Sequence, residues 1–165
     1  AASDVYKRIF YNTVELYIYT DNILKGEIFM EMKRVLIPVD GTERSMHSLD
    51  FIKGIFPKDS VHITLMNVKE LVFINGMAVA EELKDAQEIG QQILNKAAER
   101  MQGYSISTYF TFGYAGDEIL KKAKEDKTNV IIMTKSTKSA LIRMIGSTTT
   151  HVVKGAKCVV MIVPE

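Results

Sequence analysis

Hydrophobic positions along most of the chain follow two alternating spacings. Short apolar runs, the first of them RVLIPVD at residues 34–40, alternate with segments in which apolar residues recur every three or four positions. The runs are typical of strands buried on both faces of a sheet, and the second spacing is typical of helices with one buried side. The predicted strands span residues 34–40, 60–68, 105–112, 129–134 and 158–163. The predicted helices span residues 46–56, 80–101, 117–125 and 147–154.

Strands that alternate with helices predict right-handed crossovers, and therefore an α/β fold with a parallel sheet and helices on both faces. In such sheets, ligands bind beyond the carboxyl ends of the strands, where the strand order reverses. Asp40, Val68, Phe112 and Met133 lie at these ends. The irregular segment Lys69–Val79 follows the second predicted strand and is long enough to act as a lid.

The beginning of the chain does not follow this rhythm. TVELYIYT at residues 13–20 alternates in polarity and predicts a strand, paired with residues 27–32 across a turn at Lys25–Gly26. We interpret residues 1–31 as an N-terminal strand or hairpin extension and residues 32–165 as the α/β domain. The extension fits an arm for a partner subunit, the tail of an upstream domain or an artefact of the start site, and the sequence leaves these alternatives open.

Composition fits an ordinary soluble protein. Hydrophobic residues make up 47% of the 165 residues and charged residues 25%, and the net charge of +1 gives no general reason to expect a nucleic-acid partner. A single cysteine, Cys158, excludes an intramolecular disulfide and a cysteine zinc cluster, and fits a reducing compartment. No secretory signal is recognisable, and no apolar run approaches the ~20 residues that span a bilayer. We therefore expect a cytoplasmic protein without a membrane span.

The three histidines form no recognisable catalytic or metal-binding pattern. His47 shares a segment with Asp40 and Ser45 but is expected at a helix surface, and His62 alternates within a strand. His151 lies on the last predicted helix, where it either approaches a bound phosphate or faces solvent. Their spacing does not match a metal site, and the sequence contains neither a phosphate-loop motif nor a nucleophile elbow. We predict no catalytic residues and no metal ligands.

Three segments, in this order and spacing, resemble the universal stress protein family. They are VLIPVDGTERS at residues 35–45, FGYAGDEILKKAKEDKTNVIIM at 112–133 and IGSTTTHVVKGAKCVVMIVP at 145–164. The resemblance extends from about Met32 to Pro164. It implies an open five-stranded parallel sheet of order 3-2-1-4-5, a dimer, and a function in stress tolerance.

The resemblance also implies where a nucleotide would bind. In family members that bind ATP or AMP, the acidic residue after the first strand lies near adenine and ribose, and the ends of the second and fourth strands supply apolar contacts. The phosphates lie on a glycine loop and on a Gly-Ser/Thr pair that follows it. Carried over residue by residue, the candidate cofactor-binding residues are Pro38, Asp40, Val68, Met133, Thr134, Thr137, Gly146, Ser147, Thr148 and Thr149.

The phosphate loop departs from the family pattern. Thr134 and Thr137 stand where the family has glycine, and eight residues rather than nine separate Thr137 from Gly146. Glycine takes a positive φ and lets backbone N–H groups approach a phosphate, whereas β-branched threonine takes that conformation at a cost. We therefore expect a damaged triphosphate cradle.

Other features of the same region favour an anion. Gly146 to Thr148 precede a predicted helix, whose N-terminus suits an anion. The segment from Lys127 to Pro164 has no acidic residue and six basic ones: Lys127, Lys135, Lys138, Arg143, Lys154 and Lys157. A monophosphate, an adenine nucleotide in an altered pose, and an exposed loop with a plain helix cap are all consistent with this pattern. The cofactor is left open between ATP, AMP and none.

Three functions follow in order of preference. The first is a dimeric regulatory or binding module of the stress response without robust catalysis. The second is an adenine-nucleotide switch or weak ATPase, and the third is an accessory domain of a larger transporter or sensor. The last predicted strand is expected at an edge of the sheet, where so apolar a strand needs covering, so we expect a homodimer paired through it across a two-fold axis. The expected interface residues are Cys158, Val159, Val160, Met161, Ile162 and Val163.

Overall fold

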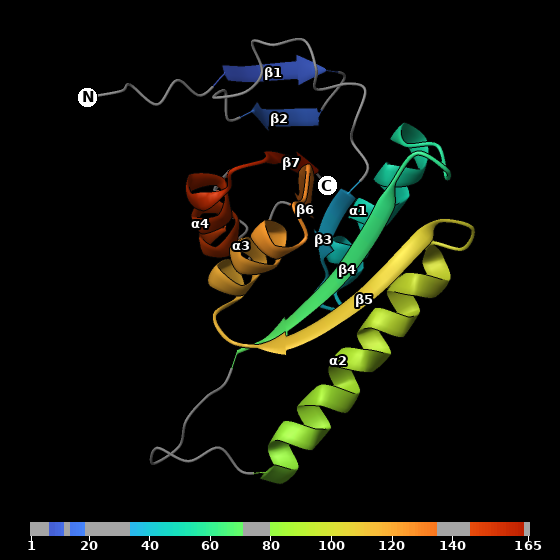
Figure 1. Ribbon diagram of the computed structural model, residues 1–165, viewed down its shortest axis with the longest axis vertical. Helices are drawn as coiled ribbons and strands as arrows, with labels where there is room; N and C mark the ends of the chain where they lie inside the picture. Colours follow the sequence, from blue (N-terminus) through green and yellow to red (C-terminus); the bar gives the residue numbers. More distant parts are fainter. Residues whose placement is uncertain (1–6, 12–13, 19–33, 71–79, 135–145, 164–165) are drawn as a thin grey trace.

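The computed structural model describes residues 7–11, 14–18, 34–70, 80–134 and 146–163 (Figure 1). Strands in this part of the chain form one sheet of order β1-β2-β7-β6-β3-β4-β5. The strands are β1 Lys7–Tyr11, β2 Val14–Ile18, β3 Arg34–Pro38, β4 His62–Lys69, β5 Ser105–Phe112, β6 Val130–Thr134 and β7 Val159–Val163. The helices are α1 Glu43–Ile55, α2 Ala80–Arg100, α3 Ala115–Glu125 and α4 Ser147–Gly155.

Strands β3 to β7 form the predicted parallel sheet. β3 pairs in parallel with β4 and β6, β4 pairs with β5, and β6 pairs with β7. In chain order this arrangement is 3-2-1-4-5, so the predicted fold class is confirmed. The strand order reverses at β3, because the chain first builds outward through β4 and β5 and then crosses back to β6 and β7.

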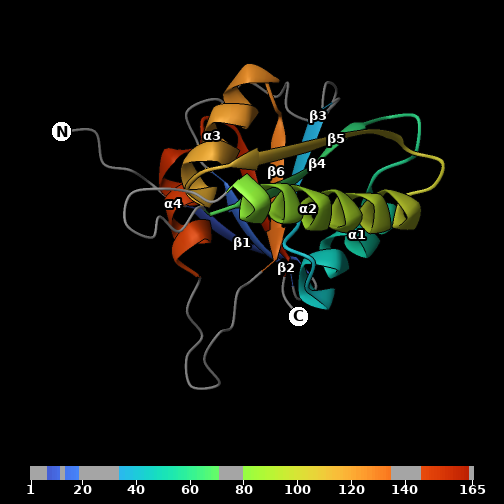
Figure 2. The same cartoon turned by 90° about the horizontal axis from the view of Figure 1, so that it is seen from below.

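Helices cover both faces of this sheet, α1 and α2 one face and α3 and α4 the other (Figure 2). Side chains along β3 divide between the two cores. Val35 and Ile37 pack with α1 and α2, and Leu36 between them packs with α3 and α4. All three are at most 1% exposed, which explains why β3 reads as a continuous apolar run rather than an alternating one.

The end of α3 contains a lysine in a left-handed conformation. Lys127 has φ 51°, and it is the single non-glycine residue with positive φ among the described residues. The Lys127 N–H donates to Lys124 O at 3.2 Å, and the Thr128 N–H donates to Ala123 O at 2.8 Å. This is the hydrogen-bond pattern of a Schellman C-cap, in which the left-handed position usually holds glycine. Lys127 thus terminates α3 at some conformational cost.

The N-terminal extension adds two strands to the sheet. β1 and β2 form an antiparallel hairpin, and β2 then lies antiparallel along β7, with Glu15 opposite Ile162, Leu16 opposite Met161 and Tyr17 opposite Val160. The predicted strand in residues 13–20 is confirmed by β2.

The partners of β2 differ from those expected. Residues 27–32, the partner predicted for this strand, lie outside the described residues, and both edges of β2 are occupied by β1 and β7. The expectation that β7 is an edge strand is wrong for the same reason: its outer side is paired with β2 of the same chain (Figure 1).

Candidate functional site

The carboxyl edge of the sheet gathers the predicted site residues that lie at strand ends. β3 and β6 are parallel neighbours, so the turn after Pro38 and the end of β6 at Met133 and Thr134 lie at the same edge. Val68, near the end of β4, lies on the other side of β3. The reversal of strand order between β3 and β6 is the position at which open α/β sheets bind ligands.

A buried amide fixes the turn that leads to Asp40. The Val39 N–H donates to Met66 O at 2.8 Å, which continues the parallel ladder one residue beyond β3. Asn67 Nδ2, on a side chain only 5% exposed, donates to Val39 O at 2.7 Å. Gly41 then takes φ +86°, and a β-carbon there would lie 2.9 Å from the Ile93 side chain. Sequence reasoning missed Asn67, although a lone amide inside the apolar run HITLMNV is the signal that marks it.

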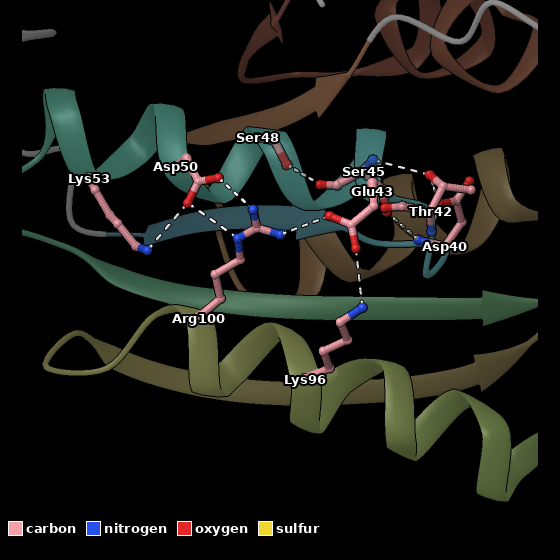
Figure 3. Close-up of polar contacts among 9 residues, drawn as sticks. All are labelled: Asp40, Thr42, Glu43, Ser45, Ser48, Asp50, Lys53, Lys96 and Arg100. Atoms are coloured by element: carbon pink, nitrogen blue, oxygen red, sulfur yellow. Dashed lines mark hydrogen bonds and ion pairs between the residues drawn. The ribbon is translucent and has the colours of Figure 1, made fainter.

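The Asp40 carboxylate is tied to the beginning of α1 (Figure 3). Its Oδ1 accepts hydrogen bonds from Thr42 N at 3.0 Å and from Thr42 Oγ1 at 2.6 Å. Thr42 is the N-cap of α1, and its Oγ1 accepts from Ser45 N at 3.1 Å. The Asp40 N–H donates to Ser45 Oγ at 3.2 Å, which closes the loop of contacts.

These bonds keep Asp40 ionised. Partial burial raises the pKa of the Asp40 carboxyl, but the hydrogen bonds from Thr42 and Ser45 outweigh burial, and the pKa is lowered below its ordinary value. Both bonds from Thr42 fall on Oδ1. An ionised carboxylate has two acceptor oxygens and can accept hydrogen bonds from a sugar hydroxyl.

An ion-pair network joins α1 to α2 on the far side of this cap (Figure 3). Arg100 Nη2 lies 2.9 Å from Asp50 Oδ2, and its Nη1 lies 3.3 Å from Glu43 Oε2. Lys96 Nζ contacts the other Glu43 oxygen at 3.2 Å, and Lys53 Nζ lies 3.3 Å from Asp50 Oδ1. The groups are largely solvent-exposed, so they orient the two helices more than they stabilise them.

The N-terminus of α4 has the features expected of an anion site. Gly146 is the N-cap and supplies no side-chain hydrogen bond, and the first turn contains no acidic residue. Ser147 is exposed and Thr148 half-buried, whereas the Thr149 side chain is 2% exposed and faces the core. The positive end of this helix is therefore compensated neither by a capping side chain nor by a nearby carboxylate of its own first turn.

Thr134 occupies an ordinary strand position. It is the last residue of β6 and pairs opposite Val163 of β7, with no positive φ. The conformational cost predicted for a threonine in place of the family glycine therefore does not arise at Thr134. Thr137 lies outside the described residues, as do Lys135, Lys138 and Arg143.

The histidines make local contacts. His151 Nε2 lies 2.8 Å from Asp117 Oδ1, and its ring meets Tyr114 edge-on at 5.5 Å, so it joins α4 to the beginning of α3. His62 on β4 lies between two serines of β5, with Nδ1 2.8 Å from Ser105 Oγ and Nε2 2.8 Å from Ser107 Oγ.

Within the described residues, no group of three or more histidine, cysteine or acidic side chains could hold a metal ion. The helices of that part of the chain include none long and apolar enough to cross a membrane. His47 is exposed, as predicted from its helix position.

The fold defines a doubly wound α/β domain whose strand order reverses between β3 and β6. The chain matches the model of the universal stress protein family over residues 31–164 and belongs to this family. It is 28% identical over 160 residues to universal stress protein MJ0531 of Methanocaldococcus jannaschii, with 92% of each chain covered.

Two solved structures show the same fold at low identity. A universal stress protein in complex with cAMP is 17% identical with a TM-score of 0.64, covering 81% of this chain and 98% of that one. A universal stress protein family protein from Arabidopsis thaliana with AMP bound is 17% identical with a TM-score of 0.55, covering 81% and 92%.

The alignments with known proteins differ in how much of the N-terminal extension they cover. The family match begins at residue 31, and the share of this chain that the cAMP-bound structure leaves uncovered is about the size of residues 1–31. The alignment with the M. jannaschii protein covers too much of this chain to omit the whole extension. Part of the extension therefore has a counterpart in that relative.

Proposed function

We propose that this protein is a cytoplasmic regulatory module of the stress response that acts by binding and has no robust catalytic activity. Membership of the universal stress protein family supports the stress role. Two titratable groups near the candidate site take part in structural contacts, which favours a binding role over a catalytic one. The Asp40 carboxylate caps α1 through Thr42, and His151 pairs with Asp117.

A second candidate function, adenine-nucleotide binding, is favoured by one arrangement in particular. The ionised Asp40 carboxylate follows β3, and the uncapped N-terminus of α4 follows β6, the parallel neighbour of β3. One group suits ribose hydroxyls and the other suits a phosphate. Two structural relatives, at identities that establish only the fold, are solved with cAMP and with AMP.

The phosphate side of this site favours a short phosphate chain. Thr134 remains in the β6 strand, so the backbone does not turn at the first position where the family carries a loop glycine. Gly146 and Ser147 at the N-terminus of α4 are retained. We therefore expect one phosphate to be held at α4 and a triphosphate to be held less well, so that AMP binds more tightly than ATP.

Isothermal titration with AMP, cAMP and ATP tests the nucleotide hypothesis. We expect a micromolar dissociation constant for AMP, at least about tenfold weaker in Asp40→Ala, which is about 1.4 kcal/mol. Asp50→Asn is the matched control, because it neutralises an α1 carboxylate in the α1–α2 network rather than at the carboxyl edge. No heat at millimolar AMP would dismiss nucleotide binding and leave the non-nucleotide binding module.

Phosphate release from ATP tests the absence of catalysis separately. Typical enzymes turn over at about 1–10³ s⁻¹. We expect release to stay far below that range in the full chain with Mg²⁺ present. Turnover within it, lost in Asp40→Ala and kept in Asp50→Asn, would contradict the non-catalytic proposal and favour the ATPase alternative.

The predicted homodimer through Cys158–Val163 is constrained by the fold. β7 already pairs with β6 on one side and β2 on the other, so no backbone edge is left for a second copy while β2 is in place. Val160 and Ile162 are 3% and 2% exposed and belong to the core with α3 and α4. Charges at these two positions would therefore disturb the core as well as any interface, and they are poor tests of a dimer.

A further inference from the structure

We propose that the N-terminal hairpin is an intramolecular competitor for β7, so that this chain self-associates through β7 only when β2 leaves it. The contact surface is the backbone edge of β7, and the partner that fits it in the absence of β2 is a second copy of the same strand. The inference goes beyond the proposed binding function and does not depend on it.

β2 has the same orientation relative to β7 that a symmetry-related copy of β7 would have. Two copies of β7 related by a two-fold axis perpendicular to the sheet run antiparallel, because the axis reverses the strand direction. β2 also runs antiparallel to β7 and pairs with residues Val160 to Ile162. β2 therefore occupies the hydrogen-bonding positions that a symmetry-related β7 would use, and the two arrangements exclude each other.

The strand that β2 covers needs a partner. β7 reads VVMIV and contains no charged residue, and a strand edge of this composition is a template for pairing with another chain. Its inner edge is already paired with β6 from Val159 to Val163. Removing β2 would leave the outer N–H and C=O groups of an apolar strand uncovered, which favours β-augmentation by another strand.

The covalent connection within the chain favours pairing of β7 with β2 over pairing with a second copy of β7. β2 ends at Ile18 and β3 begins at Arg34, so the hairpin and the sheet belong to one chain. Linking two pairing segments in one chain generally gives an effective concentration on the order of millimolar. A second copy present at micromolar concentration competes at a disadvantage of about a thousandfold for equal pairing energy. The full chain is thus expected to be monomeric where the isolated edge would dimerise.

The extension distinguishes this chain from the solved relative with cAMP. The alignment covers 98% of that chain but 81% of this one, so that relative has no room outside the matched region for a comparable hairpin. The hairpin therefore lies outside the part of this chain that matches that relative.

A cysteine pair in the full chain tests the intramolecular contact directly. Leu16 and Met161 are opposite in the β2–β7 register, and opposite residues of antiparallel strands have Cα atoms about 4.5–5.5 Å apart, within the range for a disulfide. In a Cys158→Ala background, Leu16→Cys with Met161→Cys should oxidise to an intrachain bond and migrate as a monomer without reductant. Leu16→Cys with Val163→Cys is the control, because it is displaced by two residues along β7.

Each outcome of the oxidation decides the contact. A monomeric crosslinked band in the matched pair, absent from the displaced pair, supports the proposal. A covalent dimer means that the hairpin is donated to a second copy and overturns the intramolecular pairing. Equal or no crosslinking in the two pairs shows that β2 does not lie along β7 and overturns it as well.

Displacing β2 in the full chain tests the competition. Proline lacks the backbone N–H, and adjacent residues of a strand direct these groups to opposite sides, so Leu16→Pro with Tyr17→Pro removes ladder bonds on both edges of β2. Sedimentation velocity should show at least about a hundredfold lower dimer dissociation constant than for the wild type. Leu16→Val with Tyr17→Phe keeps both N–H groups and should sediment like the wild type.

Folding of the domain is monitored alongside. Among the residues whose side chains the structure describes, the two hydrophobic cores draw on β3 to β7 and the helices, so the far-UV circular dichroism of the helices should be retained in the proline variant. A folded proline variant that stays monomeric at the same concentrations shows that β7 does not self-associate when β2 is displaced. A wild type that sediments as a dimer while its crosslink is intrachain shows that the dimer uses another surface. Either result overturns the proposal.

Discussion

Replacement of Asp40 separates its part in the α1 cap from any part in ligand binding. Asp40→Ala removes the acceptor of two hydrogen bonds from Thr42, of 3.0 and 2.6 Å. Hydrogen bonds to a charged group contribute ~1.5–3 kcal/mol where water is excluded, and exposure of Asp40 and Thr42 reduces this to about 1 kcal/mol. The negative charge near the N-terminus of α1 adds ~0.3–1 kcal/mol. We expect Asp40→Ala to lower the free energy of unfolding by about 1–2 kcal/mol at pH 7.

The pH dependence gives the sharper test. The pKa of Asp40 is lower in the folded protein than in the unfolded chain, so its stabilisation is complete above about pH 4 and is lost as the pH falls through the folded pKa. The difference between wild type and Asp40→Ala should therefore shrink towards pH 3. Asp40→Asn retains an oxygen acceptor and should lose about half as much stability at pH 7 as the alanine variant.

Urea unfolding followed by circular dichroism at pH 7 and at pH 3 measures these differences. Glu43→Gln is the control: this carboxylate also lies in the first turn of α1 but is fully exposed and pairs with Lys96 and Arg100 instead of capping. Its effect should be smaller than that of Asp40→Asn and should fall with added salt. Equal stability of wild type and Asp40→Ala at pH 7, or a difference unchanged at pH 3, would refute the capping role.

Two further predictions concern single residues outside the site. Lys127→Gly should raise the free energy of unfolding by about 0.5–1 kcal/mol, measured by thermal unfolding. The left-handed conformation costs lysine ~1–2 kcal/mol, and the greater conformational entropy of glycine in the unfolded chain offsets part of the gain. Lys127→Ala keeps the β-carbon and should give no such gain in the same measurement. Burial raises the pKa of the Cys158 thiol to about 11, so at pH 8 it should react with a disulfide reagent about a hundredfold more slowly than in urea-unfolded protein. Equal rates in the two states would show that the thiol is not buried.

The central elements were predictable because local and long-range preferences agree in them. β3, β4 and β6 are buried on both faces and read as short apolar runs, and the second half of α2 buries Leu94 and Ala97 at helical spacing. The order of the parallel strands came from the family resemblance rather than from periodicity. Hydrophobic spacing identifies a buried strand, but it does not identify which strand lies beside it.

The strand ends that flank the candidate site were predictable, and their local contacts were not. Asp40 follows β3, and Met133 and Thr134 end β6, the parallel neighbour of β3. Asp40 stabilises the beginning of α1 through Thr42 and Ser45, and these contacts require the turn at Gly41. Thr149 shares the Ser-Thr run with Ser147 but turns into the core, because successive residues of a helix point in directions about 100° apart.

The N-terminal extension shows most clearly where sequence reasoning stops. Alternation of polar and apolar residues identified β2 as a strand, and strand edges have to be paired. The partners expected from the sequence were residues 27–32 or another subunit, and the sheet of the same chain was not among them. The sequence indicates that β2 and β7 each need a pairing partner. The predicted partner of β2 was a local hairpin strand, and the predicted partner of β7 was a second copy of the chain. The structure pairs these two strands with each other. Because that contact joins segments far apart in the chain, it depends on the sheet having been completed up to β7, and no pattern confined to either segment contains it.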